Sequence, residues 1–420
     1  SKARRIDLVG QGLRVAFQEE SLPMHEVKKR ISRILLKTGN APLVGFSDGW
    51  WNSYINAIRA NSTDYENKER DLLSKTELLS KESLSTDSWL ELYRLSLISG
   101  LFLVGVAVRS IAEARALQEA SVAGVDSRTV RQALAVSLEN GDAESANRYL
   151  NELAVRGEQS ARIEHGRWFV NLVCHGDSEA LVGDLEAEQT MFSNVHQKSV
   201  AVVGPMPSKV ASGDEIDSFD LVAKFNYRGG EGGCDPTTQG TRVEIAYYNI
   251  EQSKYISRKM SSTFMADLLS PVFIKDKAYR VLRNANPRGR VIRNAQWLLL
   301  DSEFNAGPNA VYDILRFSPT ALKVFNSDLM LTAGRFKGYW QPGANEVNYC
   351  YSFAKTHDPV IQFRYFQSIW RSRAITGDAA FEEVMSLTLE EYICRLQQAH
   401  GSIGREKICP FLEPESARLH

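Results

Sequence analysis

The stretch that decides the fold is SVAVVGPMPSKVASGDEIDSFDLVAKFNYRGGEGGCDPTTQGTRVEIAYYN, residues 199–249. It contains three apolar runs, at 200–203, 221–225 and 243–248, and each is followed by Gly or Asn. Short apolar runs of this kind, ended by turn residues, are typical of buried strands. The runs therefore predict an open α/β sheet, and we expect the active site outside the carboxyl ends of its strands, where such sheets bind ligands.

The segment after the first run, 204–208, reads Gly-Pro-Met-Pro-Ser and predicts a tight turn at a strand end. Its prolines exclude the G-x-G-x-x-G fingerprint of dinucleotide sites, and it lacks the G-x-x-x-x-G-K-[ST] pattern. Backbone N–H groups after Gly204, with Ser208 nearby and a helix amino terminus, could still hold a phosphate. An ordinary strand-to-helix turn explains the segment equally well.

Residues 200–226 resemble the large sialyl motif of the sialyltransferases. The shared features are the apolar strand, the pattern V-G-x-x-P-S, and E-I-D-S-x-D-x-V-x-x-F-N after a spacer. Residues 240–249 are similar to the family's G-x-(K/R) continuation, which ends in Asn. Residues 327–334 occupy the region of the family's small motif, although the match there is not convincing.

The resemblance implies a Rossmann-like, GT-A-variant catalytic domain that needs neither a metal nor a cofactor. The co-substrate would be a CMP-activated acidic sugar, either sialic acid or the related bacterial sugar Kdo. Because the sequence after the motif departs from that of true sialyltransferases, we favour Kdo slightly. The residues that we expect to contact the donor nucleotide are Gly204, Pro205, Met206, Ser208, Asn226, Asn249, Tyr349 and Tyr351.

His357 and Asp358 are the expected catalytic residues. Sialyltransferases carry an essential His late in the chain, ahead of a carboxyl-terminal helix, and His357 precedes a predicted amphipathic helix from about Val360. An imidazole titrates near working pH, so His357 could act as general base or as donor to the phosphate. Asp358 could orient it or be the base itself. The family's Glu four residues after the His is missing here, and a loop His is more often a cap or surface residue.

Other polar residues have competing interpretations. The alternate spacing of Tyr349 and Tyr351 is more typical of a half-buried strand than of a phosphate site. Asp220 is expected to be structural, because Asp turns and caps the chain, and Asp217 is left open. An acidic sugar needs a guanidinium to pair with its carboxylate, although a surface role is the commoner one for any single arginine. The available arginines are Arg228, Arg242, Arg335 and Arg364.

Length and composition predict two domains, a helical one at 1–190 and the α/β catalytic one at 191–420. Apolar residues at helical spacing from Trp89 onward, with turns near 140, 157 and 176, suggest helical-hairpin repeats of the tetratricopeptide kind. An irregular helical domain fits this pattern equally well. The Trp50-Trp51 region is harder to assign, and 179–194 is expected to link the domains.

The overall charge of −1 gives no electrostatic case for nucleic acid. Five scattered cysteines without metal spacing suggest reduced thiols in the cytoplasm, with peripheral attachment to the inner membrane left open. The most apolar segment, 97–108, is about half of the roughly 20 residues that a spanning helix needs. Because the sequence begins at Ser1 rather than Met, an excised module and a missing anchor both stay open.

The sequence thus predicts a glycosyltransferase that moves Kdo or sialic acid from CMP to a glycan acceptor in bacterial surface polysaccharide or lipopolysaccharide synthesis. The helical domain would bind a protein partner or a long glycan acceptor. The alternative is a helical-repeat interaction protein that carries a degenerate nucleotide-binding domain. A nicotinamide or methyl-donor enzyme on the same sheet is the weakest alternative, because the glycine fingerprint is absent.

Overall fold

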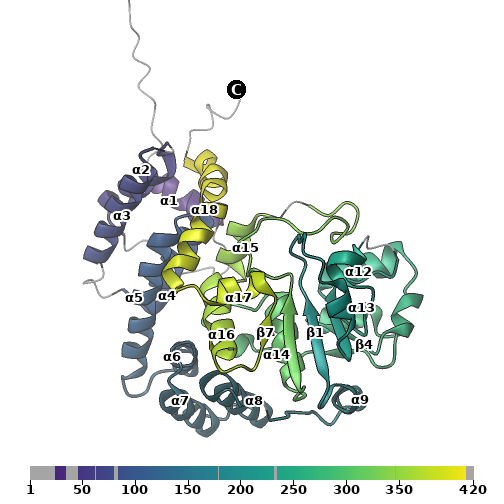
Figure 1. Ribbon diagram of the computed structural model, residues 1–420. Coiled ribbons are helices and arrows are strands. Elements are labelled where there is room, and N and C mark those ends of the chain that lie inside the picture. The colour runs from purple at the N-terminus through teal and green to yellow at the C-terminus, as the bar shows by residue number, and fades with distance from the viewer. Residues whose placement is uncertain are drawn as a thin grey trace, which may run out of the picture.

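A single parallel sheet forms the centre of the α/β part of the molecule (Figure 1). The computed structural model describes residues 24–34, 46–61, 63–79, 84–177, 179–230, 234–345 and 347–412. Within them the sheet has seven strands in the order β5-β4-β3-β2-β1-β6-β7. The strands are β1 (Ser199–Val203), β2 (Leu221–Phe225), β3 (Ile245–Tyr248), β4 (Ser270–Phe273), β5 (Arg290–Val291), β6 (Ala321–Phe325) and β7 (Thr376–Gly377). The predicted α/β class and its first three strands are confirmed, although β3 begins two residues later than the apolar run.

The strand order places a topological switch point between β1 and β6. From β1 the chain adds strands on one side as far as β5, and it then crosses to add β6 and β7 on the other side. Neighbouring strands whose connections leave in opposite directions open a crevice above their carboxyl ends. In the parallel register Val203 lies opposite Phe325, so the loops that follow these two residues meet at this crevice.

Helices cover both faces of the sheet. Tyr247 points to α14 and donates a hydrogen bond to Asp313 at 2.8 Å, whereas Tyr248 packs with Ile256 and Ala278 on the other face. This alternation follows from the two-residue period of a strand. The helices of this part are α9 (Glu186–Val195), α10 (Gly213–Asp217), α11 (Pro236–Gln239), α12 (Ile250–Lys259), α13 (Asp276–Leu282) and α14 (Ala306–Leu315), with 3-10 turns at Thr263–Asp267 and Gln296–Leu298.

The amino-terminal part of the chain is helical in every described segment, and each helix from α4 to α8 packs on the next. The predicted stop at Asn140–Gly141 is confirmed, since α6 ends there with Gly141 at φ 69°. Trp50 and Trp51 are buried within α2, while residues 44 and 45 lie outside the described residues. The predicted linker at 179–194 is largely helix α9. The helices are α1 (Met24–Ile34), α2 (Asp48–Arg59), α3 (Tyr65–Leu79), α4 (Thr86–Ile98), α5 (Phe102–Ala120), α6 (Ser127–Glu139), α7 (Ala143–Val155) and α8 (Ser160–Val170), which a π-turn extends over Asn171–His175.

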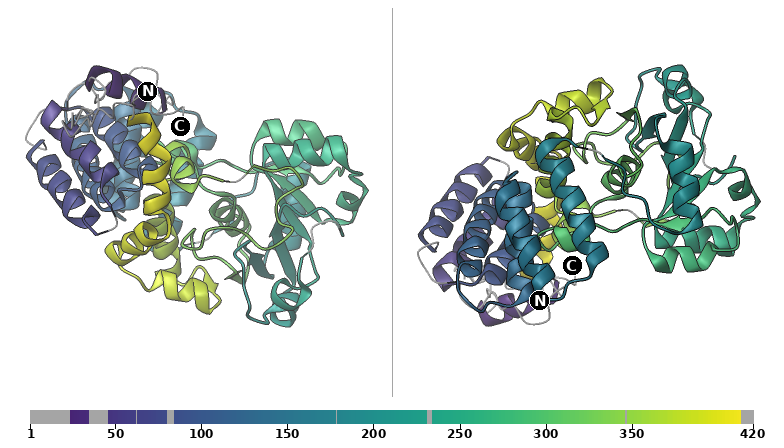
Figure 2. Two further views of the ribbon diagram at one scale, coloured as in Figure 1. Left: turned by 90° about the horizontal axis from the view of Figure 1, so that it is seen from above. Right: turned by 90° about the horizontal axis from the view of Figure 1, so that it is seen from below.

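The carboxyl-terminal helices return to the amino-terminal ones. Helix α15 packs on α4, and α18 packs on α2, α4 and α5, so that α18 lies among the early helices in both views of Figure 2. The strand interpretation of the Tyr349 and Tyr351 spacing is wrong, because both residues lie in α15, which Asn348 caps. After β7 the chain forms two more helices, α17 and α18. The bounds are α15 (Tyr349–Lys355), α16 (Pro359–Arg371), α17 (Ala379–Met385) and α18 (Leu389–Ile408), followed by a 3-10 turn at Cys409–Leu412.

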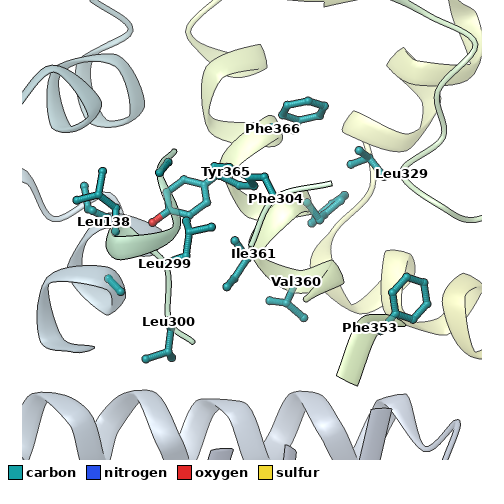
Figure 3. Close-up of a cluster of buried hydrophobic side chains, with 14 of the residues drawn as sticks. Leu138, Leu299, Leu300, Phe304, Leu329, Phe353, Val360, Ile361, Tyr365 and Phe366 are labelled. Atoms are coloured by element: carbon teal, nitrogen blue, oxygen red, sulfur yellow. The ribbon is translucent and has the colours of Figure 1, made fainter. Parts of the chain in front are cut away.

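One continuous apolar core joins the early helices to the sheet. Figure 3 shows part of it, where Leu138 of α6 and Leu299 lie near Tyr365 of α16. Phe304, which precedes α14 in the chain, belongs to the same cluster. The rings of Phe304 and Tyr365 are 5.8 Å apart in an edge-to-face contact. Because this core holds α16 and the start of α14, these elements are rigid supports for the loops above them.

None of the described helices is both long and apolar enough to cross a bilayer.

Candidate functional site

A cavity of about 400 Å³ occupies the switch point at the carboxyl ends of β1 and β6. Pro205 and Met206 line it from the loop after β1, and residues 326–330 line it from the loop after β6. The first turns of α12, α14, α15 and α16 complete the wall, because helices of a parallel sheet begin near the carboxyl edge. The structure thus places a ligand-sized cavity at the edge where the sequence predicts the active site.

The amino terminus of α14 is an uncapped helix end in this wall. Asn249 caps α12 and Asp358 caps α16, whereas Asn305 makes no side-chain cap bond to the described residues at the start of α14. The first residues of α14, Ala306 and Gly307, line the cavity, and the space beside Gly307 is open. Backbone N–H groups and the helix dipole at such a terminus favour a phosphate or carboxylate.

His357 lies in the cavity wall, as predicted. Its Nδ1 is 3.1 Å from the carbonyl oxygen of Glu303, which can only accept a hydrogen bond. In the neutral ring this contact keeps the proton on Nδ1 and leaves the lone pair on Nε2, which can then serve as a base. The Glu303 carboxylate also lines the cavity and pairs with Lys275 at 2.7 Å.

Asp358 is not among the residues that line this cavity. Its side chain is buried and accepts hydrogen bonds from Tyr93 at 2.8 Å and from the Nε of Arg109 at 3.0 Å. It also accepts the Val360 N–H at 2.8 Å as the cap of α16. The predicted catalytic pair is therefore separated, since His357 faces the cavity while Asp358 ties α16 to the early helices.

The loop after β1 does not offer the phosphate cradle that its sequence suggested. The Gly204 N–H donates to the Phe325 carbonyl at 2.7 Å, and the Met206 N–H donates to the Asn326 carbonyl at 3.1 Å. Pro205 has no N–H to offer. Ser208 is half-buried and does not line the cavity, and its Oγ accepts the Val210 N–H. Pro205 and Met206 contribute side chains to the wall, but the anion site moves to α14.

Asn226 lines a smaller cavity of about 40 Å³, which shares Pro205, Phe225 and Tyr339 with the main one. Its Nδ2 donates to the Tyr339 carbonyl at 2.5 Å, while its buried Oδ1 has no partner among the described residues. A buried acceptor without a partner costs about 1–3 kcal/mol, which a ligand donor would recover. Lys224 lines the same space, and burial lowers the pKa of its ammonium group.

Asn326 repeats this arrangement after β6. Both asparagines follow Phe at a strand end and adopt left-handed backbone, with φ 52° at Asn226 and 51° at Asn326. Asn tolerates this region better than other non-glycine residues do. The Asn326 Oδ1 also has no partner among the described residues. We missed Asn326 in the sequence, although its Phe-Asn ending after an apolar run is the signal that identified Asn226.

The remaining predicted nucleotide contacts differ in their positions. Asn249 lines the cavity, but its side chain is engaged in a capping box with Gln252. Tyr349 lines the cavity, and its hydroxyl accepts the Gly334 N–H at 3.3 Å. Tyr351 is exposed outside the cavity, where its hydroxyl accepts a hydrogen bond from Lys355 at 2.6 Å. The structure therefore brings Asn249 and Tyr349 to the site and leaves Tyr351 out.

Of the four candidate arginines, Arg335 is the one that lines the main cavity. Its guanidinium lies 5.3 Å from the ring centre of Tyr349 and donates to the Gly334 carbonyl at 2.6 Å. Arg228 borders the smaller cavity and binds the carbonyls of Gly338 and Tyr339. Arg364 instead pairs with Glu113 and Glu139 in the interior.

The acidic residues of the large motif are structural. The Asp217 carboxylate accepts N–H groups of Thr241 and Arg242, and burial raises its pKa less than these hydrogen bonds lower it. Asp220 accepts the N–H and hydroxyl of Ser199, which confirms its structural interpretation. Arg242 binds the Phe219 and Asp220 carbonyls and Glu244, away from both cavities.

Sequence reasoning also missed the segment 303–307, which brings Glu303 and the α14 terminus to the site. Asn305 followed by Pro308 near the start of an apolar helix was the available signal. The described residues contain no group of three or more His, Cys, Asp or Glu side chains that could hold a metal ion. No protein-family model, curated protein or solved structure matches this chain.

Proposed function

We propose that this chain is a glycosyltransferase that moves an acidic sugar from a CMP-activated donor to a glycan acceptor. The observation that carries the proposal is the cavity at the switch point, where the sialyl-like segment meets His357 and residues 327–330. Pro205 and His357, which are about 150 residues apart in the chain, both line this cavity, and both belong to segments that the resemblance singled out. Kdo is the favoured donor sugar, and bacterial surface polysaccharide is the favoured product.

The geometry suggests where each part of the donor would lie. The nucleotide end would lie in the main cavity at its border with the smaller one, where the unpaired amide oxygen of Asn226 suits an amino or hydroxyl donor at the edge of the nucleotide. The phosphate or sugar carboxylate would lie at the α14 amino terminus. Whichever of the phosphate and the sugar carboxylate does not lie at α14 would pair with Arg335, which lines the main cavity.

In the transfer step the acceptor hydroxyl oxygen bonds to the anomeric carbon of the sugar. The bond from that carbon to the phosphate oxygen breaks, and CMP leaves with the electron pair. The hydroxyl proton passes to Nε2 of His357, the nitrogen that the Glu303 contact leaves basic. Positive groups at the phosphate stabilise the charge that develops on CMP.

The direct test incubates the protein with CMP-Kdo or CMP-sialic acid and a panel of glycan acceptors. Acceptor-dependent release of CMP supports the proposal, and the donor that is consumed identifies the sugar. His357→Ala serves as the inactive control, and the exposed Tyr351→Phe serves as a matched active control. If a folded protein turns over neither donor with any acceptor of the panel and also fails to bind CMP, the proposal is abandoned and the helical-repeat interaction protein becomes the better account.

A further inference from the structure

A third cavity, of about 680 Å³, lies outside the transfer site, between the early helices and the segment 293–301. It is bounded by the first turns of α6 and α8 and by the segment 293–301. We call it the arginine groove, because four of its lining residues are Arg128, Arg131, Arg162 and Arg293. The proposed transfer reaction assigns no role to these residues.

The lining of the groove is cationic, although each of its arginines has an acidic neighbour. Among the described lining residues Asp301 is the single acid, and it pairs with Arg94. Glu158 is shared between Arg131 at 3.5 Å and Arg162 at 3.1 Å. Asp87 holds Arg128. Glu158 and Asp87 are not part of the lining, so the guanidinium groups present N–H donors to the groove while their carboxylate partners orient them.

Arg293 is the least engaged of the four. Among the described residues its one ion pair is to Glu164 at 3.8 Å, and the Glu164 side chain is 64% exposed. A buried Nη1 of Arg293 makes no hydrogen bond within the described structure. Because Arg293 lines the groove and is only weakly paired, its guanidinium group can bind an anionic ligand there.

One uncapped helix amino terminus reinforces the arginines. Helices α6 and α8 lie on either side of α7, and both contribute first-turn residues to the groove. Asp126 caps α6, but no side chain of the described residues caps α8, whose second residue, Ala161, lines the groove. The positive end of the α8 dipole therefore adds to the attraction for an anion, whereas the Asp126 carboxylate already occupies that of α6.

The rest of the wall suits a saccharide. The Trp297 ring lies against α8 where Gly166 leaves room, since an added Cβ there would come within 3.0 Å of that ring. Its buried indole N–H has no partner among the described residues. Asn294, Gln296 and Gln132 supply amides. An aromatic face with amides and guanidinium groups can bind the ring, hydroxyls and carboxylate of an acidic sugar.

The groove and the transfer cavity share one stretch of chain. Asp301 lines the groove and Glu303 lines the transfer cavity, so the two walls are at most about 7 Å apart along the backbone. Residues 293–301 thus border the groove and residues 303–308 border the transfer cavity. A polymer bound in the groove would therefore stay close to the transfer cavity, because one stretch of chain forms part of both walls.

We propose that the arginine groove binds the acidic glycan that this enzyme extends, at a position outside the transfer cavity. The identity of the glycan rests on the proposed function, whereas anion binding at the groove does not. Single-stranded nucleic acid is less suitable, because proteins bind it with several aromatic side chains along a basic groove. Among the described lining residues, Trp297 is the one Trp, Tyr or Phe.

The test is calorimetric titration of the full chain with an octamer of sialic acid, with a neutral maltose-type octamer and an oligouridylate of equal charge as comparisons. The test variant is the double substitution Arg162→Gln and Arg293→Gln, which leaves Glu158 paired with Arg131. The matched control is Arg167→Gln, an exposed arginine of α8 outside the groove. We expect the double variant to weaken octamer binding at least tenfold and the control to leave it unchanged.

Octamer binding that the double variant retains, or no octamer binding by the wild type, would overturn the groove assignment. Tighter binding of oligouridylate with the same arginine dependence would overturn the choice of a glycan. CMP titration of the same wild-type preparation reports on the transfer cavity separately. CMP binding without octamer binding therefore removes the groove alone, and groove-dependent octamer binding without CMP binding removes the proposed transfer.

Discussion

Two consecutive residues, His357 and Asp358, have different tasks in this protein. The backbone turns between them, so that the imidazole lines the cavity while the carboxylate enters the core. We expect His357→Ala to lower the transfer rate by about 10²- to 10⁴-fold, the range typical of a general base. CMP affinity should not change, because the His357 ring is assigned to the acceptor hydroxyl. Steady-state kinetics would measure the transfer rate of the variant, and calorimetry would measure its CMP affinity. Loss of CMP binding together with normal turnover would contradict the assigned role of His357.

Asp358→Asn should affect stability instead of catalysis. The amide keeps the α16 cap but removes the charge that pairs with Arg109, which still contacts Glu113 and Glu139. Breaking one buried pair of this kind costs about 3 kcal/mol. Urea unfolding would measure this loss, and transfer activity at a permissive temperature should stay close to wild type. A variant as stable as wild type but inactive would return Asp358 to the catalytic site.

The buried His165 is expected to make the stability of the fold sensitive to acid. Burial first, and then the charges of Arg316 and Arg293, lower the pKa of its imidazole to about 3 from 6.5. The unfolded chain therefore takes up this proton first as the pH falls, so stability is full above about pH 6.5 and is lost progressively toward pH 3. Between pH 6.5 and 5 the loss from this group approaches about 2 kcal/mol.

Urea unfolding at these two pH values checks this expectation. His165→Phe is the comparison, because it keeps an aromatic ring beside Trp168, which His165 stacks on at 5.9 Å, and removes the titrating group. The variant should lose about 2 kcal/mol less than wild type over the interval. Equal losses in the two proteins would show that His165 is not the source.

At the scale of single elements, the close approach of β1 and β6 depends on Gly204. A Cβ at this position would lie 2.4 Å from the Asn326 carbonyl oxygen, a backbone atom that cannot move without shifting the 326–330 loop. Gly204→Ala should therefore cost about 1–3 kcal/mol and weaken CMP binding. Gly307→Ala is the matched control, because it meets open space in the first turn of α14 and should stabilise by about 0.5 kcal/mol. Thermal unfolding of the two variants would decide, and equal stabilities would contradict the steric account.

Periodicity predicted most elements but not their partners. The strands β1 to β3 and helices α4 to α8 follow from apolar spacing and from turn residues, which act locally. The strand prediction at 349–351 failed because the two-residue spacing of Tyr349 and Tyr351 is also compatible with a helix, and Asn348 caps the helix that forms there. The uncapped α14 terminus was missed for a related reason, since a missing cap bond is visible only in three dimensions.

At the scale of the whole molecule, the sequence predicted the edge of the sheet but not the switch point. Strand order depends on where the chain crosses, and nothing in residues 199–249 indicates that β6 pairs with β1. Whether the loop after β1 can bind a phosphate depends on that pairing, because the Phe325 and Asn326 carbonyls accept the N–H groups of Gly204 and Met206. Likewise, the return of α18 to α2 and α5 relies on contacts some 300 residues apart in sequence.

The central claim is a CMP site in the paired cavities at the switch point. The most direct test is calorimetric titration of the folded protein with CMP, with CDP, UDP and NAD as comparison ligands. We predict selective CMP binding that weakens in Asn226→Ala, because that side chain presents the buried acceptor of the smaller cavity. Circular dichroism of the variant controls for folding. Absence of CMP binding by a folded wild-type protein would contradict the account.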